Sequence, residues 1–418
     1  FEATLSLRVN SSNITQTEKI LIPAVAIECK RYLERNMMDE CSGTSKKIRS
    51  ATPYCKFYVV AEYLKMDDAS PEKTGIDEIY ILRHQKNSDR LKRDFTPNPI
   101  DSELVWEFYS EVIDHALSDI SLAISSAPSN FNFPIHIGFS LDQTKFIRLA
   151  NSFRAKIAMG KKRGGPANET LDYNQIISWI DQGIKSDFDP PAKQSVLYNN
   201  GQDWMTYTLS DGSGYLPVDQ KIAFLAENDS AKQPADYPTD SSIILSAISN
   251  NSDSRIDSYF KYTTNFGYLR ESRGRHLFTN YRHVRFYTGN NRNVDGLTTN
   301  IFSKAELDYL KAEAQLLSGD SGSCAITLNT SAKRASSGLP AVTSSTAAKQ
   351  LLYEYSIELH LNGTIGTNFF FMRRHNLLQE GTPLHFPVPA DELEISGIDP
   401  YTFGSLGGEA SASGQGWK

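Results

Sequence analysis

The carboxylates of Glu354 and Glu358 form the acidic pair whose spacing could place two reactive groups on one face of a helix. A glycoside hydrolase needs two carboxylates at a set separation, and that separation cannot be identified from the sequence. No partner residue accompanies the pair, so we interpret it as a solvated helix face. Scattered histidines form no ligand pair, for example His136, His276, His283 and His375.

A possible serine nucleophile lies in the segment GDSGS at residues 319–323. These letters imitate the nucleophile motif of trypsin-like proteases, in which a histidine base and an orienting acid are also required. The histidine-bearing segment of those enzymes is absent, as are the zinc-protease, P-loop and dinucleotide-binding motifs. We interpret Gly319 as a helix end. The sequence therefore predicts no enzyme, no metal site and no cofactor.

A basic and aromatic stretch runs through residues 270–287, RESRGRHLFTNYRHVRFY. Its arginines could contact an anionic ligand or a partner surface. Alternatively, the stretch is a structural strand whose arginines pair with Asp and Glu elsewhere in the chain. We favour the second interpretation.

Aromatic side chains in the middle of the chain are the better ligand candidates, because sugars and peptides bind by stacking on exposed rings. The chain contains 20 Tyr and 21 Phe, and one group of aromatic residues lies in a segment typical of loops. Burial of the same rings against a helical scaffold is the alternative. The predicted ligand-binding residues are Trp204, Tyr207, Tyr215, Tyr281, Arg282 and Tyr287.

The overall composition is that of an ordinary globular protein of 418 residues with a net charge of -6. This mild acidity gives no general attraction to nucleic acid, so we predict no nucleic-acid partner. No apolar run approaches the roughly 18 residues of a membrane helix, and no signal peptide opens the sequence. Among the four cysteines, Cys29, Cys41 and Cys55 either supply one disulfide or remain buried free thiols.

Amphipathic periodicity predicts helices at residues 104–124, 173–184 and 346–361. Capping-box patterns begin two more, at Ser140 with Gln143 and at Ser303 with Glu306. Residues 190–302 are instead rich in Asn, Asp, Ser, Gly and Tyr, and are typical of turns and short strands. The fold class is therefore mainly α, a tetratricopeptide-like helical scaffold with an irregular loop- and strand-containing insert.

This pattern divides the chain into an N-terminal helical scaffold at 1–189, an aromatic-rich insert at 190–302 and a C-terminal helical region at 303–418. We expect the three parts to form one compact unit.

Several segments in a fixed order resemble the SusD/RagB family. They are KFIRLANSFRAKIAM at 145–159, SDSRIDSYF at 252–260, Ala312-Glu313-Ala314, GLPAV at 338–342, Glu358-Leu359, and PVP at 387–389 followed by Glu392-Leu393. The family's E-L-x-x-E-G-x-R pattern is altered, because Asn362 and Ile365 replace its second Glu and its Arg. The chain is thus similar to a divergent member.

The resemblance implies a SusD-like lipoprotein, lipid-anchored on the extracellular face of the outer membrane. Such a protein caps a SusC-like TonB-dependent β-barrel transporter and binds glycan or peptide nutrient for uptake. The alternative is a divergent structural subunit of an outer-membrane barrel assembly that binds no nutrient.

Overall fold

The computed structural model describes residues 2–8, 15–21, 24–67, 69–72, 74–136, 139–162, 171–192, 209, 216–227, 247–249, 251–263, 278–288, 295–364, 366–378 and 382. Helices account for more of these residues than strands do, so the mainly α fold class is confirmed. The chain divides into two compact units, Phe1–Asp119 and Ile120–Lys418. The three-part division at 189 and 302 stays a prediction.

The first unit is built around a parallel sheet with the strand order β3-β4-β5. The strands are β3 (Val25–Leu33), β4 (Lys56–Leu64) and β5 (Glu78–Ile81), and α1 (Arg35–Ala51) connects the first two. A crossover of this length is what parallel neighbours require. Strands β1 (Glu2–Arg8) and β2 (Thr15–Leu21) pair as a separate antiparallel hairpin.

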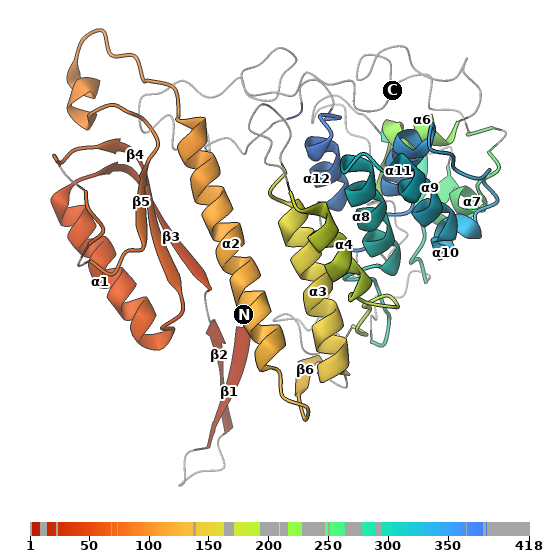
Figure 1. Ribbon diagram of the computed structural model, residues 1–418, viewed down its shortest axis with the longest axis horizontal. Helices are drawn as coiled ribbons and strands as arrows, with labels where there is room; N and C mark the ends of the chain where they lie inside the picture. The colour runs from red at the N-terminus through yellow and green to blue at the C-terminus, as the bar shows by residue number, and fades with distance from the viewer. Residues whose placement is uncertain are drawn as a thin grey trace. The chain divides into compact units, whose positions relative to one another are not determined.

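Residues on alternate sides of this sheet pack against different helices. Phe57, Val59 and Cys41 belong to the core beneath α1, which Figure 1 shows along one face of the sheet. On the other side, the ring of Tyr58 packs edge-on against Phe108 of α2 (Ser102–Ser126), with ring centroids 5.7 Å apart. We expect a helical scaffold from residue 1, but this unit also contains the strands β1 to β5, and β-branched and aromatic residues fill both faces of the parallel sheet.

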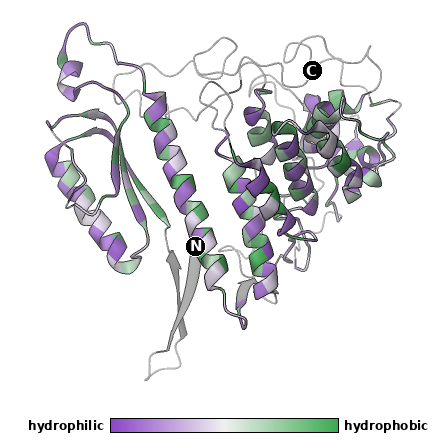
Figure 2. Ribbon diagram, viewed as in Figure 1, coloured by the Kyte–Doolittle hydropathy of each residue, from purple (hydrophilic) through white to green (hydrophobic). Residues whose placement is uncertain are grey.

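One apolar core of the second unit is built from residues of α8 (Lys304–Leu317), α9 (Ser321–Thr330), α11 (Ala347–Ile357) and α12 (Thr367–Arg374). Within it, the rings of Tyr355 and Phe371 stack with centroids 3.9 Å apart. Figure 2 shows hydrophobic and hydrophilic residues alternating along α3, as an amphipathic helix requires. The same unit also contains α3 (Gln143–Met159), α4 (Tyr173–Asp181) and α10 (Ala332–Ala335).

A small antiparallel sheet with the strand order β8-β10-β9 adds a second core to this unit. Its strands are β8 (Pro217–Asp219), β9 (Phe260–Tyr262) and β10 (Phe278–His283). The short helices α6 (Gln220–Ala226) and α7 (Ser254–Tyr259) precede or follow these strands. Tyr353 and Ile357 of α11 complete this core, so the sheet is tied to the helical part.

Helix ends agree with the sequence patterns in part. Gly319 ends the α8 region with φ +89°, a left-handed conformation that favours glycine. The predicted cap at Ser140 is wrong, because this residue lies in β7 (Phe139–Asp142), which pairs with β6 (Asn132–His136). The side chain of Asp142 instead accepts a hydrogen bond from the Lys145 amide at 2.8 Å.

The four cysteines are free thiols, so no disulfide joins Cys29, Cys41 and Cys55; Cys41 and Cys55 are buried, as the second alternative expects, whereas Cys29 is exposed. Burial raises the pKa of Cys41 to about 11 and that of Cys324 to about 12, so both thiols stay protonated at neutral pH. In the parts of the chain that the structure describes, no helix is both long and apolar enough to cross a membrane.

Candidate functional site

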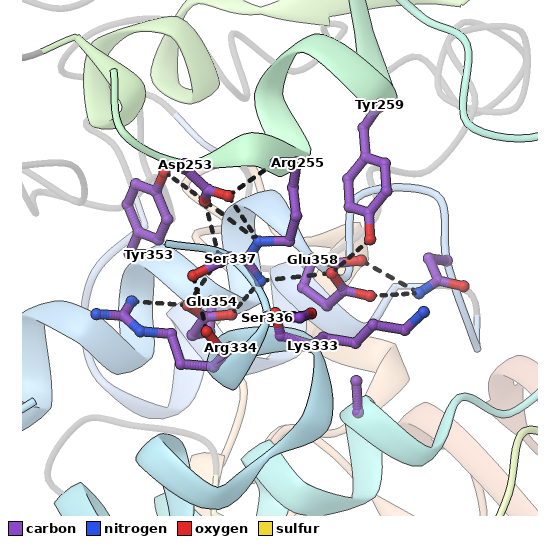
Figure 3. Close-up of polar contacts among 12 residues, drawn as sticks. Asp253, Arg255, Tyr259, Lys333, Arg334, Ser336, Ser337, Tyr353, Glu354 and Glu358 are labelled. Atoms are coloured by element: carbon purple, nitrogen blue, oxygen red, sulfur yellow. Dashed lines mark hydrogen bonds and ion pairs between the residues drawn. The ribbon is translucent and has the colours of Figure 1, made fainter. Parts of the chain in front are cut away.

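The paired carboxylates Glu354 and Glu358 lie in the interior, where both side chains are 0% exposed. Their prediction as a solvated helix face is therefore wrong. Glu354 receives hydrogen bonds from Arg255 Nη1 at 2.6 Å and Nη2 at 2.9 Å, from Arg334 Nη1 at 2.8 Å and from the Tyr309 hydroxyl at 2.7 Å. Figure 3 shows the arginines approaching this carboxylate from different segments.

Arg255 is held on its other side by Asp253, which also caps α7. The Asp253 carboxylate accepts from the Arg255 backbone N–H at 2.9 Å and from Arg255 Nη2 at 2.8 Å, and it accepts from the Tyr353 hydroxyl at 2.9 Å. Burial alone would lower the pKa of Arg255, but the bonds to Glu354 and Asp253 outweigh it and raise that pKa. Arg255 is therefore a permanent buried cation.

Glu358 is paired with an arginine from the basic stretch of the sequence. Arg285 Nη2 lies 2.8 Å from Glu358 Oε1, and Arg285 Nη1 donates to the Glu358 carbonyl at 2.9 Å. The guanidinium also lies over the ring of Tyr259, whose hydroxyl donates to Glu358 Oε2 at 3.0 Å. For Arg285, the structural interpretation of the basic stretch is confirmed.

Helix α8 carries two further buried carboxylates, one on each side of Tyr309. Glu306 is bound by Lys156 of α3 and accepts from the hydroxyl of Thr367 at 3.1 Å. Glu313 accepts from Arg374 Nε at 2.7 Å and from the Tyr355 hydroxyl at 2.7 Å. Along α8, these contacts join α3, α11 and α12 through charged groups.

These contacts compensate every buried charge of the network. The carboxylates accept from arginine, lysine and tyrosine, so none is left as a general base, and no serine or cysteine nucleophile takes part. Among the residues that the structure describes, no three His, Cys, Asp or Glu side chains gather to hold a metal ion. The arrangement therefore links α3, α7, α8, α11 and α12 through paired charges.

Of the predicted ligand-binding residues, the structure describes Tyr281, Arg282 and Tyr287. Trp204, Tyr207 and Tyr215 lie outside the described residues. Tyr281 is 6% exposed, and its hydroxyl accepts a hydrogen bond from the Ile248 amide at 2.7 Å, so its ring is not open for stacking. Arg282 is half-buried in β10.

Tyr287, the remaining predicted residue, is 46% exposed and lines a cavity of about 300 Å³. Because Glu358 neutralises the guanidinium of Arg285, the wall offers aromatic rings and hydroxyls without a free charge. Sequence reasoning missed the threonines, since they come from two separate segments with no joint spacing. The lining residues are Arg285, Phe286, Tyr287, Thr288, Gly296, Leu297, Thr298 and Thr299.

A second feature, in the first unit, also escaped the sequence analysis. Glu28 and Lys30 lie two residues apart on β3, with Lys30 Nζ 2.8 Å from Glu28 Oε1 and about a quarter of each side chain exposed. The hydrogen bond to Glu28 raises the pKa of Lys30. The sequence signal that could have revealed this pair is an acid and a lysine at this spacing, directly after the apolar residues 25–27.

Comparison with known proteins gives different similarities for different parts of the chain. The family model described as Bpu10I restriction endonuclease matches residues 6–117. No curated protein matches the chain. Among solved structures, the native BbvCI A2B2 tetramer is 20% identical, over 27% of this chain and 40% of that chain, with a TM-score of 0.22.

Other similar solved structures are SusD-like proteins. A SusD-like carbohydrate-binding protein from Bacteroides vulgatus ATCC 8482 is 13% identical over 67% of this chain and 54% of its own, with a TM-score of 0.41. A SusD-like protein from Bacteroides fragilis NCTC 9343 is 17% identical over 69% and 63%, with a TM-score of 0.42. The chain spans less than two thirds of the length of each of these structures.

Proposed function

We propose that the second unit, Ile120–Lys418, is the surface-exposed lid of a SusC-like TonB-dependent transporter and binds glycan or peptide nutrient for uptake. The observation that carries this proposal is the meeting of segments that resemble the SusD/RagB family. Lys156, Arg255, Glu313 and Glu358 come from four such segments, and each takes part in the buried ion pairs along α8 and α11. Arg255 and Glu358 pair with each other at 3.4 Å, so two of these segments, far apart in the sequence, meet in the interior.

The cavity beside Tyr287 supports the ligand-binding part of the proposal. Its volume, about 300 Å³, is at the lower end of the range for small-molecule sites. Aromatic rings and threonine hydroxyls on a neutral wall suit an uncharged, hydroxyl-rich ligand such as a sugar. Lipid anchoring and a location on the extracellular face of the outer membrane belong to the same proposal.

Binding of soluble oligosaccharides and peptides to the full chain tests the ligand part, with calorimetry as the readout. We expect Tyr287→Ala to weaken binding at least tenfold without changing the melting temperature, because this ring is exposed. Tyr54→Ala is the matched control, since Tyr54 is 80% exposed in the other unit. Equal binding by both variants would remove the cavity from the proposal.

Purification from the native membrane tests the partner. A SusC-like barrel that copurifies, together with ligand binding, supports the lid function. A barrel of another function, with no ligand bound by the chain, would favour the alternative of a structural subunit.

A second candidate function concerns the first unit, Phe1–Asp119, and it departs from the expectation of no enzyme and no nucleic-acid partner. The match of residues 6–117 to a restriction endonuclease family, with the Glu28–Lys30 pair inside it, favours action on DNA. Nucleases commonly use metal ions. Glu28 offers one carboxylate, and the described residues hold no group of three ligands, so they do not complete a metal site.

Incubation of the full chain with plasmid DNA and Mg²⁺ tests this second candidate. Cleavage that is lost in Glu28→Gln but kept in Glu62→Gln would support it. Glu62 is a matched control, because its carboxylate is also paired and partly exposed on the neighbouring strand. Intact plasmid, with no binding of duplex DNA, would reject it.

A further inference from the structure

Two histidines from different elements lie together in the interior of the second unit. His283, the last residue of β10, is 2% exposed, and its ring centroid lies 5.5 Å from that of His360, which follows α11. Phe260 of β9 lies against both rings, at 6.0 and 5.7 Å. The pair therefore lies where β9, β10 and the end of α11 meet.

These imidazoles lack the hydrogen bonds that buried polar groups normally make. Within the described part of the chain, neither ring nitrogen of His283 has a partner, nor does the buried Nε2 of His360. Leaving such atoms unsatisfied in the interior is unfavourable. Adding a proton to either ring would place an unpaired cation there, which is more unfavourable still.

The charged groups around the pair also disfavour protonation of the two histidines. Lys221 of α6 is 4% exposed, and its Nζ contacts the uncharged Asn368 Oδ1 and Met372 Sδ. Burial lowers the pKa of His360 to about 4, with the charge of Lys221 contributing. Arg285, which follows β10, is the other nearby cation.

On the side of α7 and α11, Glu358 does not offset these cations. Its carboxylate already accepts from Arg285, Arg255 and Tyr259. Burial, with contributions from His360 and Arg285, lowers the pKa of His283 to about 2. In the closed structure both histidines are therefore neutral at all but strongly acidic pH.

We propose that His283 and His360 form an acid-sensitive latch that releases β10, and with it the cavity wall at residues 285–288, below neutral pH. Protons bind the histidines only when the segment has opened and water reaches the rings, so acid favours the open form. The wall follows β10 directly in the chain. The idea that this opening regulates ligand binding rests on the proposed function. The acid-dependent opening itself does not.

The size of the effect follows from the ordinary histidine pKa of about 6.5 in the open form. Between pH 7 and pH 5, each histidine shifts the opening equilibrium by about 25-fold, and the two together by about 600-fold. A segment without buried histidines opens with no such dependence.

Hydrogen–deuterium exchange of the full chain at pH 7 and pH 5, corrected for intrinsic exchange rates, tests the latch without any ligand. We expect the opening of residues 278–288 to increase by hundreds of times, while α8 and α9 change little. His283→Phe combined with His360→Phe should abolish the increase, and either single variant should reduce it to about 25-fold. His84→Phe is the control, because the side chain of His84 is 75% exposed.

Equal increases in residues 278–288 and in α8 and α9 would overturn the proposal. A full increase in the opening of residues 278–288 in either single variant would also overturn it. The single variants therefore provide the test if the double variant does not fold. Because the readout is exchange, a chain that binds no nutrient could still show the latch, and the two proposals fail separately.

Discussion

Arg255 presents two guanidinium nitrogens to the two carboxylate oxygens of Glu354, at 2.6 and 2.9 Å, across 99 residues of sequence. This bidentate pair joins α7 to α11 where both side chains are buried. A lysine could supply the charge but not the two parallel bonds. The pair therefore fixes how the small sheet and its helices lie against the helical core of the second unit.

Replacement of Arg255 by Met should lower the free energy of unfolding by about 3–5 kcal/mol, because Glu354 and Asp253 lose their shared cation in the interior. Arg255→Lys should recover only part of this loss. Denaturant unfolding of both variants measures the effect. As a control, Lys86→Met should change stability by less than about 1 kcal/mol, since Lys86 pairs with the fully exposed Asp67. A stable Arg255→Met variant would mean that the network contributes little.

Glu313 should make stability depend on acid pH. Burial alone would raise its pKa, but Arg374 and His375 outweigh burial and hold the folded pKa at about 2, below the ordinary 4.5. The contribution to stability is therefore complete above pH 4.5 and is lost as the pH falls toward 2, by about 3 kcal/mol in all.

Unfolding measured from pH 6 to pH 2 checks this dependence. Glu313→Gln should flatten the acid limb relative to the wild type, although its stability at pH 6 is lower. Asp67→Asn, which changes an exposed carboxylate, should leave the limb unchanged. Parallel acid limbs in the wild type and Glu313→Gln would contradict the assignment.

Gly363 should tolerate alanine less well than Gly319, although both have positive φ, at +106° and +89°. A Cβ at Gly363 would lie 2.5 Å from Glu306 Oε2, whereas one at Gly319 meets nothing within 4 Å. Gly319→Ala should cost about 1 kcal/mol from backbone strain alone. Gly363→Ala should cost clearly more, as thermal unfolding can measure, and equal losses would show that Glu306 moves freely.

Tyr281→Phe separates a structural role from ligand binding. Loss of the hydroxyl leaves the Ile248 amide without its acceptor, so stability should fall by about 1 kcal/mol. Ligand affinity should stay unchanged, in contrast to Tyr287→Ala. A Tyr281→Phe variant that loses affinity at unchanged stability would return Tyr281 to the binding site.

Local sequence patterns predicted the features that depend on residues close together in the chain. The periodicity of residues 104–124 predicted α2, and Gly319 marked the helix end, because backbone conformation and side-chain spacing act over a few residues. The parallel sheet of the first unit escaped this reasoning. Its parallel strands are each short, and their pairing across α1 depends on contacts that no single segment displays.

The sequence by itself determined that the chain is mainly helical and that motif segments occur in a fixed order. Only the tertiary structure decided what their charged residues do. The spacing of Glu354 and Glu358 is the same on a solvated face and in a core, and partners such as Arg255 and Arg285 lie about 100 and 73 residues away. Tyr281 and Tyr287 are equally aromatic in sequence, yet packing buries one ring and leaves the other beside the cavity. Burial and long-range pairing are properties of the folded chain, so residue type and spacing alone do not reveal them.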